Sequence, residues 1–451
     1  MFDNIAHALR QIKSDVAQAL EASLIARICL ELGHRWRERE LDPVTTVRGF
    51  LLQVLHCNTA CSHVPHLLGK SFSAEAYGQA RARLPLELFQ RLLGEVCQRL
   101  PNLLDTAARW RGHHLWLVDG SSCSMPDTPE LQNAFGQPGQ QMPGCGFPVA
   151  HLLTLFHAGT GLLLRTIAAP LRTHDLAQAA QLHAEMSPGD VLIADRGFCS
   201  YAHVALLLRG GLHAVFRLHQ KQLVDFRIGR MHSPPRGPYK NFQGLPKTRW
   251  IKWLGTLDQQ VEYFKPKELP AWLDAETYAA LPASLVLREL RYRIEQRGCR
   301  TREVILVTTL TDAELYPASE LAGLYGRRWQ VETDLRHLKQ TLHMDVLHTK
   351  TVAGIHKELA MFALVYNLVR LVMLAAAQRQ KVPVERISFI DALRWLQHAP
   401  ADGKLRDLEV LPYRPGRHEP RVRKRRPKEY DLMNRPRDEL RKALMHQRIT
   451  P

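Results

Sequence analysis

The sequence predicts an α/β fold: a mixed sheet with helices, interrupted by a β-rich insertion and flanked by helical N- and C-terminal regions. Two observations support this fold class. Strand-like and helix-like stretches alternate between residues 111 and 220, a pattern typical of a sheet covered by helices. On either side of this α/β part, apolar residues recur at steps of three and four, which is the helix spacing. The 451 residues are too many for one small core, so we expect more than one domain.

Residues 1–110 are predicted to form a helical N-terminal domain. The stretches SDVAQALEASLIARICLELG and TTVRGFLLQVLH have helical spacing, and AYGQARARLPLELFQRLLGEVCQRL continues it with an interruption at Pro85. Arg81 and Arg83 add positive charge to this region. Two arginines do not define a DNA-binding module, so DNA binding, which we predict, and simple packing are both open.

A group of cysteines and histidines lies in HCNTACSHVPH, namely Cys57, Cys61, His63 and His66. Their spacing differs from that of a usual zinc site, so the boundary between a helix and a turn is the favoured interpretation. The eight cysteines of the chain show no disulfide framework, which fits a reducing compartment.

Residues 111–220 are predicted to be the first part of the α/β domain. LWLVDGSS reads as a strand that ends at Asp119, and DVLIADRGF reads as another strand that ends at Asp195. Between them, PVAHLLTLFHAGTG and LLLRTIAAPL predict a hairpin that turns at 159–161. HDLAQAAQLHAEM predicts a helix, with Thr173 as its expected N-cap.

Residues 221–300 are predicted to be a β-rich insertion. From Lys221 to Leu257 there are eight Lys or Arg and a single acid, with Pro, Gly and aromatic residues between them. Trp250 and Trp253 lie in this basic context and would face opposite sides of a strand. Residues 301–355 then return to the α/β domain through VILVTTL, and residues 356–451 form a helical C-terminal region with a basic tail.

The longest apolar run, Glu358 to Ala377, contains Asn367 and Arg370. A membrane-spanning helix needs about 20 almost uniformly apolar residues, so this run is predicted to be a buried core helix. The N-terminus lacks the apolar core of a signal peptide. We therefore expect a cytoplasmic protein without a membrane partner.

The charge of the chain predicts its partner. It has 61 Lys plus Arg against 44 Asp plus Glu, which gives a net charge of +17 and a pI near 9.7. Such an excess attracts polyanions, and nucleic acid is the commonest of them.

One helix is predicted to carry an unusual set of polar side chains from Tyr325 to Lys339. At about 100° per residue, Tyr325, Arg328, Glu332 and Lys339 fall within a stripe about 60° wide. The stripe borders a buried apolar face made of Leu324, Val331, Leu335, Leu338 and Leu342. Ion pairs on a solvated face, such as Glu332 with Arg328 or Arg336, are the ordinary interpretation of this pattern.

Three carboxylates together suggest a different chemistry. Asp119 or Asp195 taken singly is more often a turn-forming residue. Two aspartates at strand ends and a glutamate on a later helix, Glu332, can instead hold two divalent ions. Oxygen ligands with open water positions suit Mg²⁺ or Mn²⁺, and two such ions can activate a water or a 3′-hydroxyl at a phosphodiester.

These residues carry a resemblance to a known family. LWLVDGSS, IADRGF and the spacing Tyr325-x2-Arg328-x3-Glu332-x6-Lys339 resemble the three signature regions of bacterial insertion-sequence DDE transposases of the family typed on insertion sequence four. PGCGFPVAHLLTLF, MDVLHTKT and the tail PGRHEPRVRKRRPK are also similar to the family. The resemblance extends from about residue 35 to 430 and shows no departure at the catalytic positions.

The resemblance implies a ribonuclease-H-like fold with Asp119, Asp195 and Glu332 as catalytic and metal-binding triad. It implies DNA as substrate: Mg²⁺-dependent cleavage of element ends, often through a hairpin, and joining of 3′-ends to target DNA by a homodimer on paired ends. The residues expected to contact DNA are Tyr325, Arg328, Lys339, Arg196, Trp250 and Trp253. One of the two tryptophans, with Trp250 favoured, is expected to stack on a flipped base. Packing on the insertion's own core is the alternative for the tryptophans, and pairing with the carboxylates is the alternative for Arg196. A nuclease of the same fold and a non-catalytic repressor derived from a transposase are the alternatives.

Overall fold

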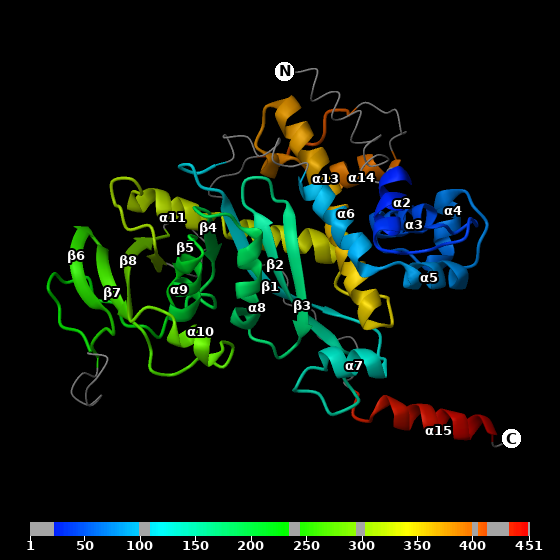
Figure 1. Ribbon diagram of the computed structural model, residues 1–451, viewed down its shortest axis with the longest axis horizontal. Helices are drawn as coiled ribbons and strands as arrows, with labels where there is room; N and C mark the ends of the chain where they lie inside the picture. Colours follow the sequence, from blue (N-terminus) through cyan, green and yellow to red (C-terminus); the bar gives the residue numbers. More distant parts are fainter. Residues whose placement is uncertain are drawn as a thin grey trace.

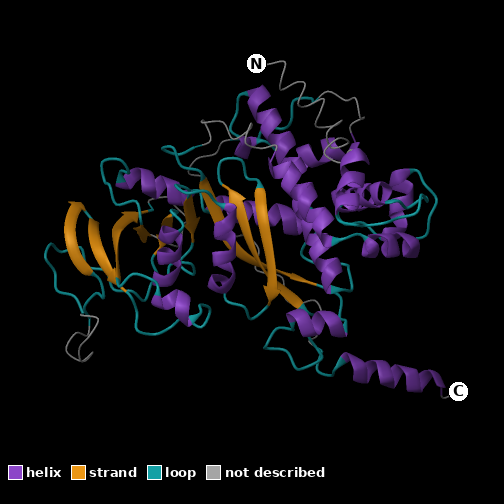
Figure 2. Cartoon of the chain, viewed as in Figure 1, coloured by secondary structure: helices purple, strands orange, loops and turns teal. Residues whose placement is uncertain are grey.

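A nine-stranded mixed sheet crosses the protein in the order β3-β2-β1-β4-β5-β9-β8-β7-β6 (Figure 1). The computed structural model describes residues 22–98, 109–233, 244–294, 303–398, 405–412 and 433–449. Helices lie on both sides of the sheet, and a larger group of helices packs beside its β3 end (Figure 2). The predicted α/β fold class with helical regions before and after the sheet is therefore confirmed.

The first five strands form the half of the sheet that carries the two aspartates. They are β1 (Leu115–Ser124), β2 (Val149–His157), β3 (Leu163–Pro170), β4 (Val191–Ala194) and β5 (His213–Arg217). β1, β2 and β3 pair antiparallel, whereas β4 pairs parallel with both β1 and β5. This arrangement agrees with the ribonuclease-H-like fold that the resemblance implies, and the hairpin around residues 159–161 is present as predicted.

The insertion extends the same sheet. Its strands are β6 (Arg249–Gly255), β7 (Asp258–Phe264) and β8 (Ser284–Arg293), which pair antiparallel in sequence order. β8 then pairs with β9 (Glu303–Thr308), and β9 pairs with β5. The insertion is β-rich as expected, but hydrogen bonding on both edges of β9 makes it continuous with the α/β sheet.

Strand alternation divides the core into two layers. Trp116 and Val118 face the layer that contains α8 (Asp175–Leu182) and α9 (Tyr201–Arg209). Leu115 and Leu117 face the other layer, which contains α11 (Ala318–Gly326), α12 (Trp329–Arg336) and α13 (Val352–Gln380). Because side chains alternate along a strand, Asp119 falls in phase with Leu115 and Leu117, on the α12 side.

The N-terminal helices share a continuous apolar core with α13, against which α3 and α6 pack. The helices in this region are α2 (Ala22–Glu31), α3 (Pro43–Leu55), α4 (Val64–Leu68), α5 (Ala74–Arg83) and α6 (Leu86–Gln98). The Cys57–His66 segment forms the turn from α3 to α4, as expected. The remaining helices are α7 (Pro129–Phe135), α10 (Ala275–Ala279), α14 (Phe389–His398) and α15 (Arg437–Ile449).

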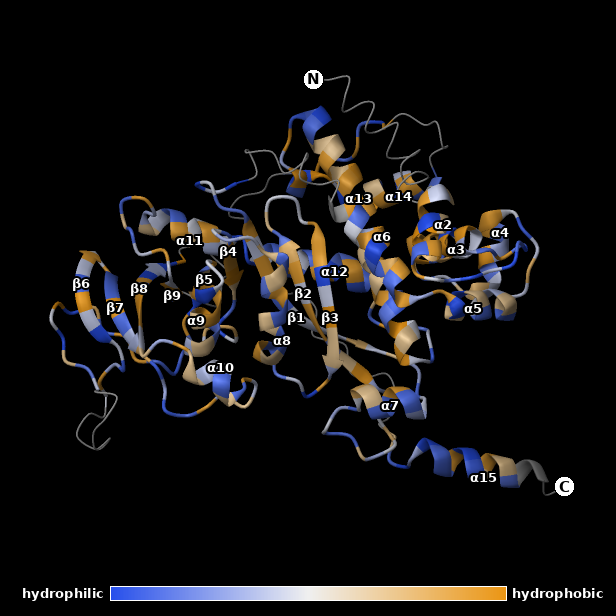
Figure 3. Cartoon of the chain, in the orientation of Figure 1, coloured by the Kyte–Doolittle hydropathy of each residue, from blue (hydrophilic) through white to orange (hydrophobic). Residues whose placement is uncertain are grey.

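The long apolar run is a core helix, as predicted. α13 is long and apolar enough to cross a membrane, but 83% of its most apolar window is buried inside the protein. Figure 3 shows orange, hydrophobic stretches on α13 and mixed orange and blue stretches on the neighbouring helix α6. Its polar residues are satisfied internally. Asn367 bonds both main-chain groups of Leu163 at 2.8 Å, and the Arg370 guanidinium donates to the carbonyl oxygen of Thr160.

Two local expectations are corrected by the structure. The N-cap of α8 is His174, whose Nδ1 accepts from the Leu176 N–H at 3.2 Å, and not Thr173. Arg81 is buried, donates to Gln53 Oε1 at 2.8 Å and lies 3.6 Å over the Phe50 ring, so it faces the core and not a ligand. The basic tail from Arg421 to Lys428 lies outside the described residues.

Candidate active site

The sheet brings the two aspartates level with each other. β1 and β4 are parallel, and Leu117 pairs with Ile193, so the register extended by two residues sets Asp119 beside Asp195. Asp195 directly follows β4, as predicted, but Asp119 does not end its strand, because β1 continues to Ser124 alongside β2. Since β4 has ended at that level, one edge of β1 is open there. A strand end at such an opening is where α/β sheets collect functional groups.

Each aspartate uses one oxygen in a local hydrogen bond. Asp119 Oδ1 accepts from the N–H of Gly120 at 2.9 Å, and Asp195 Oδ1 accepts from the N–H of Gly197 at 2.7 Å. The second bond is the turn-forming contact considered in the ordinary interpretation of such residues. Because each aspartate uses only Oδ1 in these bonds, its Oδ2 can contact a further partner.

The segment from Tyr325 to Lys339 is interrupted, whereas one continuous helix was predicted. Arg327 and Arg328 donate their N–H groups three residues back, to Leu324 and Tyr325, as in a 3₁₀ turn. α12 then begins at Trp329 and ends in a π-helical turn over His337–Thr341. The apolar phase survives these changes, because all five residues of the predicted stripe are buried: Leu324, Val331, Leu335, Leu338 and Leu342.

Arg328 lies between two of the predicted catalytic carboxylates. Its Nη2 donates to Glu332 Oε1 at 2.8 Å, and its Nη1 is 3.6 Å from Asp119 Oδ2. The guanidinium is largely buried, whereas the Glu332 side chain is 48% exposed. The i,i+4 ion pair of the ordinary interpretation is thus present, and the same arginine also links the helix to the sheet.

The electrostatics of Asp119 reflect this crowding. The pKa of Asp119 is raised to about 6, chiefly by burial. The charges of Asp195 and Glu332 contribute to this rise, and the Gly120 hydrogen bond and the Arg328 charge oppose it. Burial also raises the pKa of the Tyr325 hydroxyl to about 12. Asp119 is therefore a largely buried carboxylate that lies near two other carboxylates and is only partly compensated by Arg328 at 3.6 Å.

Asp119 and Glu332 line one open cavity of about 480 Å³. Lys339, predicted from its spacing, lines it as well. Its other lining residues are Gly120, Leu335, Arg336, Gln340 and Asp345. Sequence reasoning assigned no role to Gln340 or Asp345. Asp345 reaches the cavity because its carbonyl accepts from the Ser124 N–H at 3.0 Å, a long-range contact that no local pattern indicates.

The carboxylates are chemically suited to a hard divalent ion, but the three side chains do not converge on one position. Oxygen donors on Asp119, Glu332 and Asp195 are the type that Mg²⁺ prefers, and the raised pKa of Asp119 marks a carboxylate short of positive charge. Within the described ranges, however, no three acidic, His or Cys side chains converge closely enough to hold an ion. Asp195 also does not line the cavity that Asp119 and Glu332 share.

Long-range contacts hold α12 in place behind the cavity. Asp334 is buried on α12, and its Oδ1 lies 3.8 Å from Arg370 Nη1 on α13. Downstream, the fully buried Glu358 of α13 accepts from the N–H groups of His348 and Thr349 at 3.0 Å. These contacts fix the elements before and after the π turn to the core helix.

The other predicted DNA-contacting residues are more dispersed. Tyr325 is buried at the end of α11, near enough to Arg328 and Asp195 to feel their charges. Arg196 is exposed, and its Nη1 donates to Gln220 Oε1 at 2.7 Å and not to the carboxylates. Trp329, which sequence reasoning did not select, is 58% exposed on α12, with the Arg328 guanidinium 4.7 Å from its ring centroid.

Both tryptophans of the insertion lie on the edge strand β6. Five strand spacings of about 4.8 Å separate β6 from β4, so the tryptophans lie on the order of 24 Å from Asp195. A bulge between Trp250 and Lys252 pairs Trp250 with Val261 and Trp253 with Gln259, which share one face. The prediction of opposite faces is therefore wrong.

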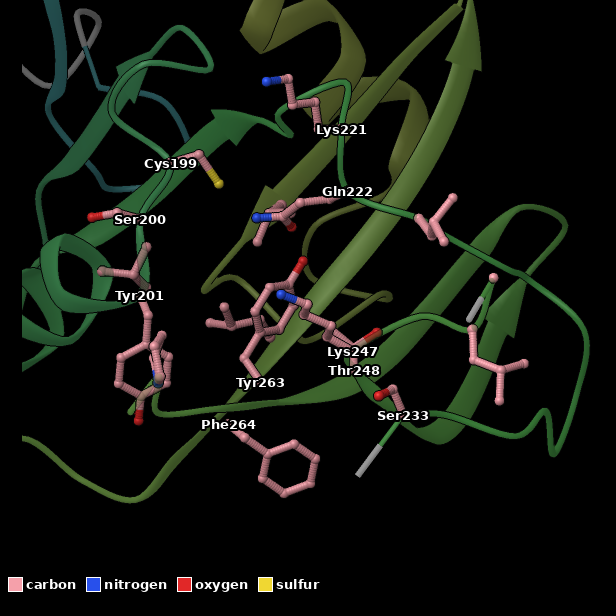
Figure 4. A pocket seen from close by; sticks show the side chains of 17 residues that line it. Cys199, Ser200, Tyr201, Lys221, Gln222, Ser233, Lys247, Thr248, Tyr263 and Phe264 are labelled. Atoms are coloured by element: carbon pink, nitrogen blue, oxygen red, sulfur yellow. The ribbon is translucent and has the colours of Figure 1, made fainter. Parts of the chain in front are cut away.

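A second cavity, of about 550 Å³, lies between the start of α9 and the insertion strands (Figure 4). Cys199, Ser200 and Tyr201 line it from one side, and Tyr263 and Thr248 line it from the other. None of the predicted catalytic carboxylates is among its lining residues, so it is distinct from the Asp119–Glu332 cavity.

Comparisons with known proteins match this chain to transposases. Residues 110–368 match the family described as the transposase DDE domain. The chain is 26% identical over 373 residues to the transposase InsG for insertion sequence element IS4 of Escherichia coli (strain K12), covering 78% of this chain and 76% of that protein. Among solved structures it is similar to a piggyBac transposase synaptic complex with hairpin DNA, with a TM-score of 0.41 and 11% identity, covering 87% of this chain and 79% of that one.

Proposed function

Because the chain belongs to the transposase DDE domain family, we propose that it cleaves the ends of an insertion sequence and joins the 3′-ends to target DNA. Asp119, Asp195 and Glu332 are its catalytic triad. The observation that carries this assignment is the shared cavity. Asp119 and Glu332 line it together with Arg336 and Lys339, whose cationic side chains are of the kind that binds phosphate.

The triad would hold Mg²⁺, with Mn²⁺ as a substitute. When bound, two such ions activate the attacking water or 3′-hydroxyl and stabilise the leaving oxygen of the phosphodiester. The burial that raises the pKa of Asp119 favours any cation that neutralises this carboxylate. Arg328, whose Nη1 lies 3.6 Å from Asp119 Oδ2, supplies part of the positive charge that neutralises this carboxylate.

The basic residues around the cavity bind and orient the DNA backbone. Lys339 and Arg336 are positioned by the same helical segment as Glu332, so phosphates that they bind lie beside the carboxylates. Arg328 is the third phosphate ligand, after its guanidinium releases Glu332 and binds a phosphate of the substrate. The exposed ring of Trp329 offers a stacking surface for a base next to these phosphates.

Synapsis of two element ends requires two copies of the chain, so the active assembly is a homodimer on paired ends. The partner is DNA, and the site of action is the bacterial cytoplasm and its nucleoid. The net charge of +17 supports association with a polyanion of this kind.

The test is cleavage of a labelled duplex that carries the end of the element together with its flanking DNA. Native protein with Mg²⁺ is expected to nick at the element boundary and to join the released 3′-end to a target plasmid. Glu332→Gln keeps a hydrogen-bond acceptor for Arg328, so it is expected to bind the duplex without nicking it. Glu303→Gln on β9 is the matched control and should cleave like the native protein, because Glu303 lies outside the cavity.

Three outcomes would contradict the proposal. Binding without cleavage by the native protein would indicate a repressor. Cleavage without joining of 3′-ends would indicate a nuclease of the same fold. Cleavage by Glu332→Gln at the native rate would remove Glu332 from the triad.

A further inference from the structure

A turn of the N-terminal helical region touches the segment that lines the catalytic cavity. The turn, residues 57–59, directly follows α3, and the segment, residues 339–349, connects α12 to α13. The Cys57 thiol donates to the carbonyl oxygen of Thr341 at 3.4 Å, at a helix end where carbonyl groups lack partners within the helix. We call residues 339–349 the cavity segment, because three of them line the catalytic cavity: Lys339, Gln340 and Asp345.

The buried carboxylate of Glu358 joins the turn to the cavity segment. Glu358 lies on α13, is fully buried and accepts from Asn58 Nδ2 at 2.9 Å. It also accepts from the main-chain N–H groups of His348 and Thr349, both at 3.0 Å, and from Thr349 Oγ1 at 2.9 Å. A buried charge is costly unless its hydrogen bonds are made. The buried side chain of Asn58 is therefore one of the donors that fix Glu358, and Glu358 fixes the end of the cavity segment.

The main chain at this contact is unusual on both sides. Cys57 and Asn58 have positive φ angles of 57° and 51°, and His343 in the cavity segment has a φ of 65°. They are half of the six non-glycine residues with positive φ in the part of the chain that the structure describes. Such conformations cost free energy, persist where surrounding contacts determine them and gather at functional sites. Their occurrence here indicates that the contact has a function.

The turn is held from behind by a buried polar network. Gln53 Nε2 donates to the carbonyl oxygen of Thr59 at 2.7 Å. Gln53 Oε1 accepts from Arg81 Nη1 at 2.8 Å and from the Tyr77 hydroxyl at 3.1 Å. Hydrogen bonds therefore connect α5 to the turn. The buried Arg81, for which DNA binding was considered, supports the turn that contacts the cavity segment.

The other side of the cavity segment is attached to β1. The Ser124 N–H donates to the Asp345 carbonyl at 3.0 Å, and the Leu347 N–H donates to the Ser124 carbonyl at 2.9 Å. β1 also carries Asp119. The cavity segment is thus held between the strand of Asp119 and the N-terminal turn, and both attachments set where Lys339 lies relative to the carboxylates.

We propose that Asn58, together with Cys57, is a positioning residue of the active site. It acts through Glu358 and the cavity segment and touches no reacting atom. The N-terminal helical region thereby contributes to the catalytic rate itself, separately from any contact that it makes with DNA. This inference rests on the proposed function for the reaction whose rate is measured.

The first experiment uses Asn58→Gly in the full-length chain. The change removes the side-chain donor, and glycine adopts a positive φ without strain, so the variant should fold. The rate constant for nicking, measured under single-turnover conditions with protein saturating the labelled duplex, should fall on the order of tenfold. The Kd for the same duplex should equal that of the native chain, because the buried Asn58 does not contact DNA.

Lys381→Gly is the matched control. Lys381 is exposed at the end of α13 with a φ of 55°, so the same change to glycine is made at a left-handed position away from the cavity segment. It should nick at the native rate. An unchanged rate in Asn58→Gly, an equal loss in both variants, or a higher Kd with an unchanged rate at saturation would each overturn the inference.

A second measurement, hydrogen exchange without DNA, separates positioning from a general loss of stability. In Asn58→Gly the main-chain N–H groups of His348 and Thr349 should exchange on the order of tenfold faster, whereas those of β4 and β5 should exchange as in the native chain. Faster exchange throughout the chain, or no change at His348 and Thr349, would overturn the inference. Because this measurement needs no cleavage, a local change in a chain that never nicks refutes the proposed function alone.

Discussion

Replacing Asp119 by asparagine should stabilise the protein while abolishing catalysis. Burial and the neighbouring carboxylates raise the pKa of Asp119 from 3.8 to about 6, so ionising it in the folded protein is unfavourable. The stability that a raised pKa contributes is present below about pH 4 and is lost as pH rises through about 6. At pH 7.5 the loss amounts to about 3 kcal/mol, from a pKa difference of about two units at 1.36 kcal/mol each.

Asparagine removes that loss, because it is neutral at every pH and its Oδ1 can still accept from the Gly120 N–H. With an unfolding entropy of about 2.1 cal/mol/K per residue, 3 kcal/mol corresponds to a Tm increase of about 3 °C for a chain of this length. At pH 5 the folded carboxyl is mostly protonated, so the gain should fall to about half.

The assay is thermal unfolding without divalent ions at pH 7.5 and pH 5, on native protein and Asp119→Asn. Asp438→Asn is the control, since the Asp438 side chain is 82% exposed and its replacement should change Tm very little. An unchanged or lower Tm for Asp119→Asn at pH 7.5 would refute the reasoning. A gain that is equal at both pH values would refute the assignment of the effect to ionisation.

Four further outcomes are expected. Arg288→Met should lower stability by about 3–5 kcal/mol in thermal unfolding, because it leaves Asp258 buried without its bidentate partner; a change below about 1 kcal/mol would contradict this. Glu358→Gln should cost about 1–3 kcal/mol by placing an amide donor against main-chain N–H groups, and native stability would speak against that contact. Arg328→Ala should raise the pKa of Asp119 further, so Tm should fall more between pH 5 and 7.5 than in the native protein; an identical pH dependence would exclude Arg328 as its counter-charge. Mg²⁺ should raise the Tm of native protein but not of Asp119→Asn, and an equal rise in both would place the ion elsewhere.

Local periodicity was sufficient for much of the fold. The alternation in LWLVDGSS and DVLIADRGF predicted β1 and β4, and the 3.6-residue phase predicted which face of the Tyr325–Lys339 segment is buried. Both signals come from residues that are neighbours in sequence, because burial of one face repeats with the geometry of the element. The same locality explains the wrong predictions: the bulge in β6 changed which faces its tryptophans share, and the 3₁₀ and π turns interrupted the Tyr325–Lys339 helix, without a strong sequence signal for either.

The sequence by itself determined the α/β class, the buried stripe beside Glu332 and the order of the three carboxylates along the chain. Tertiary structure alone decided that the insertion joins the sheet through β9, that Arg81 is buried while Arg83 is exposed, and that Arg328 lies between Asp119 and Glu332. The physical reason is that charge partners are chosen by packing. β1 and α12 are far apart in sequence, and only their contact across the core sets which side chains meet and which pKa values shift.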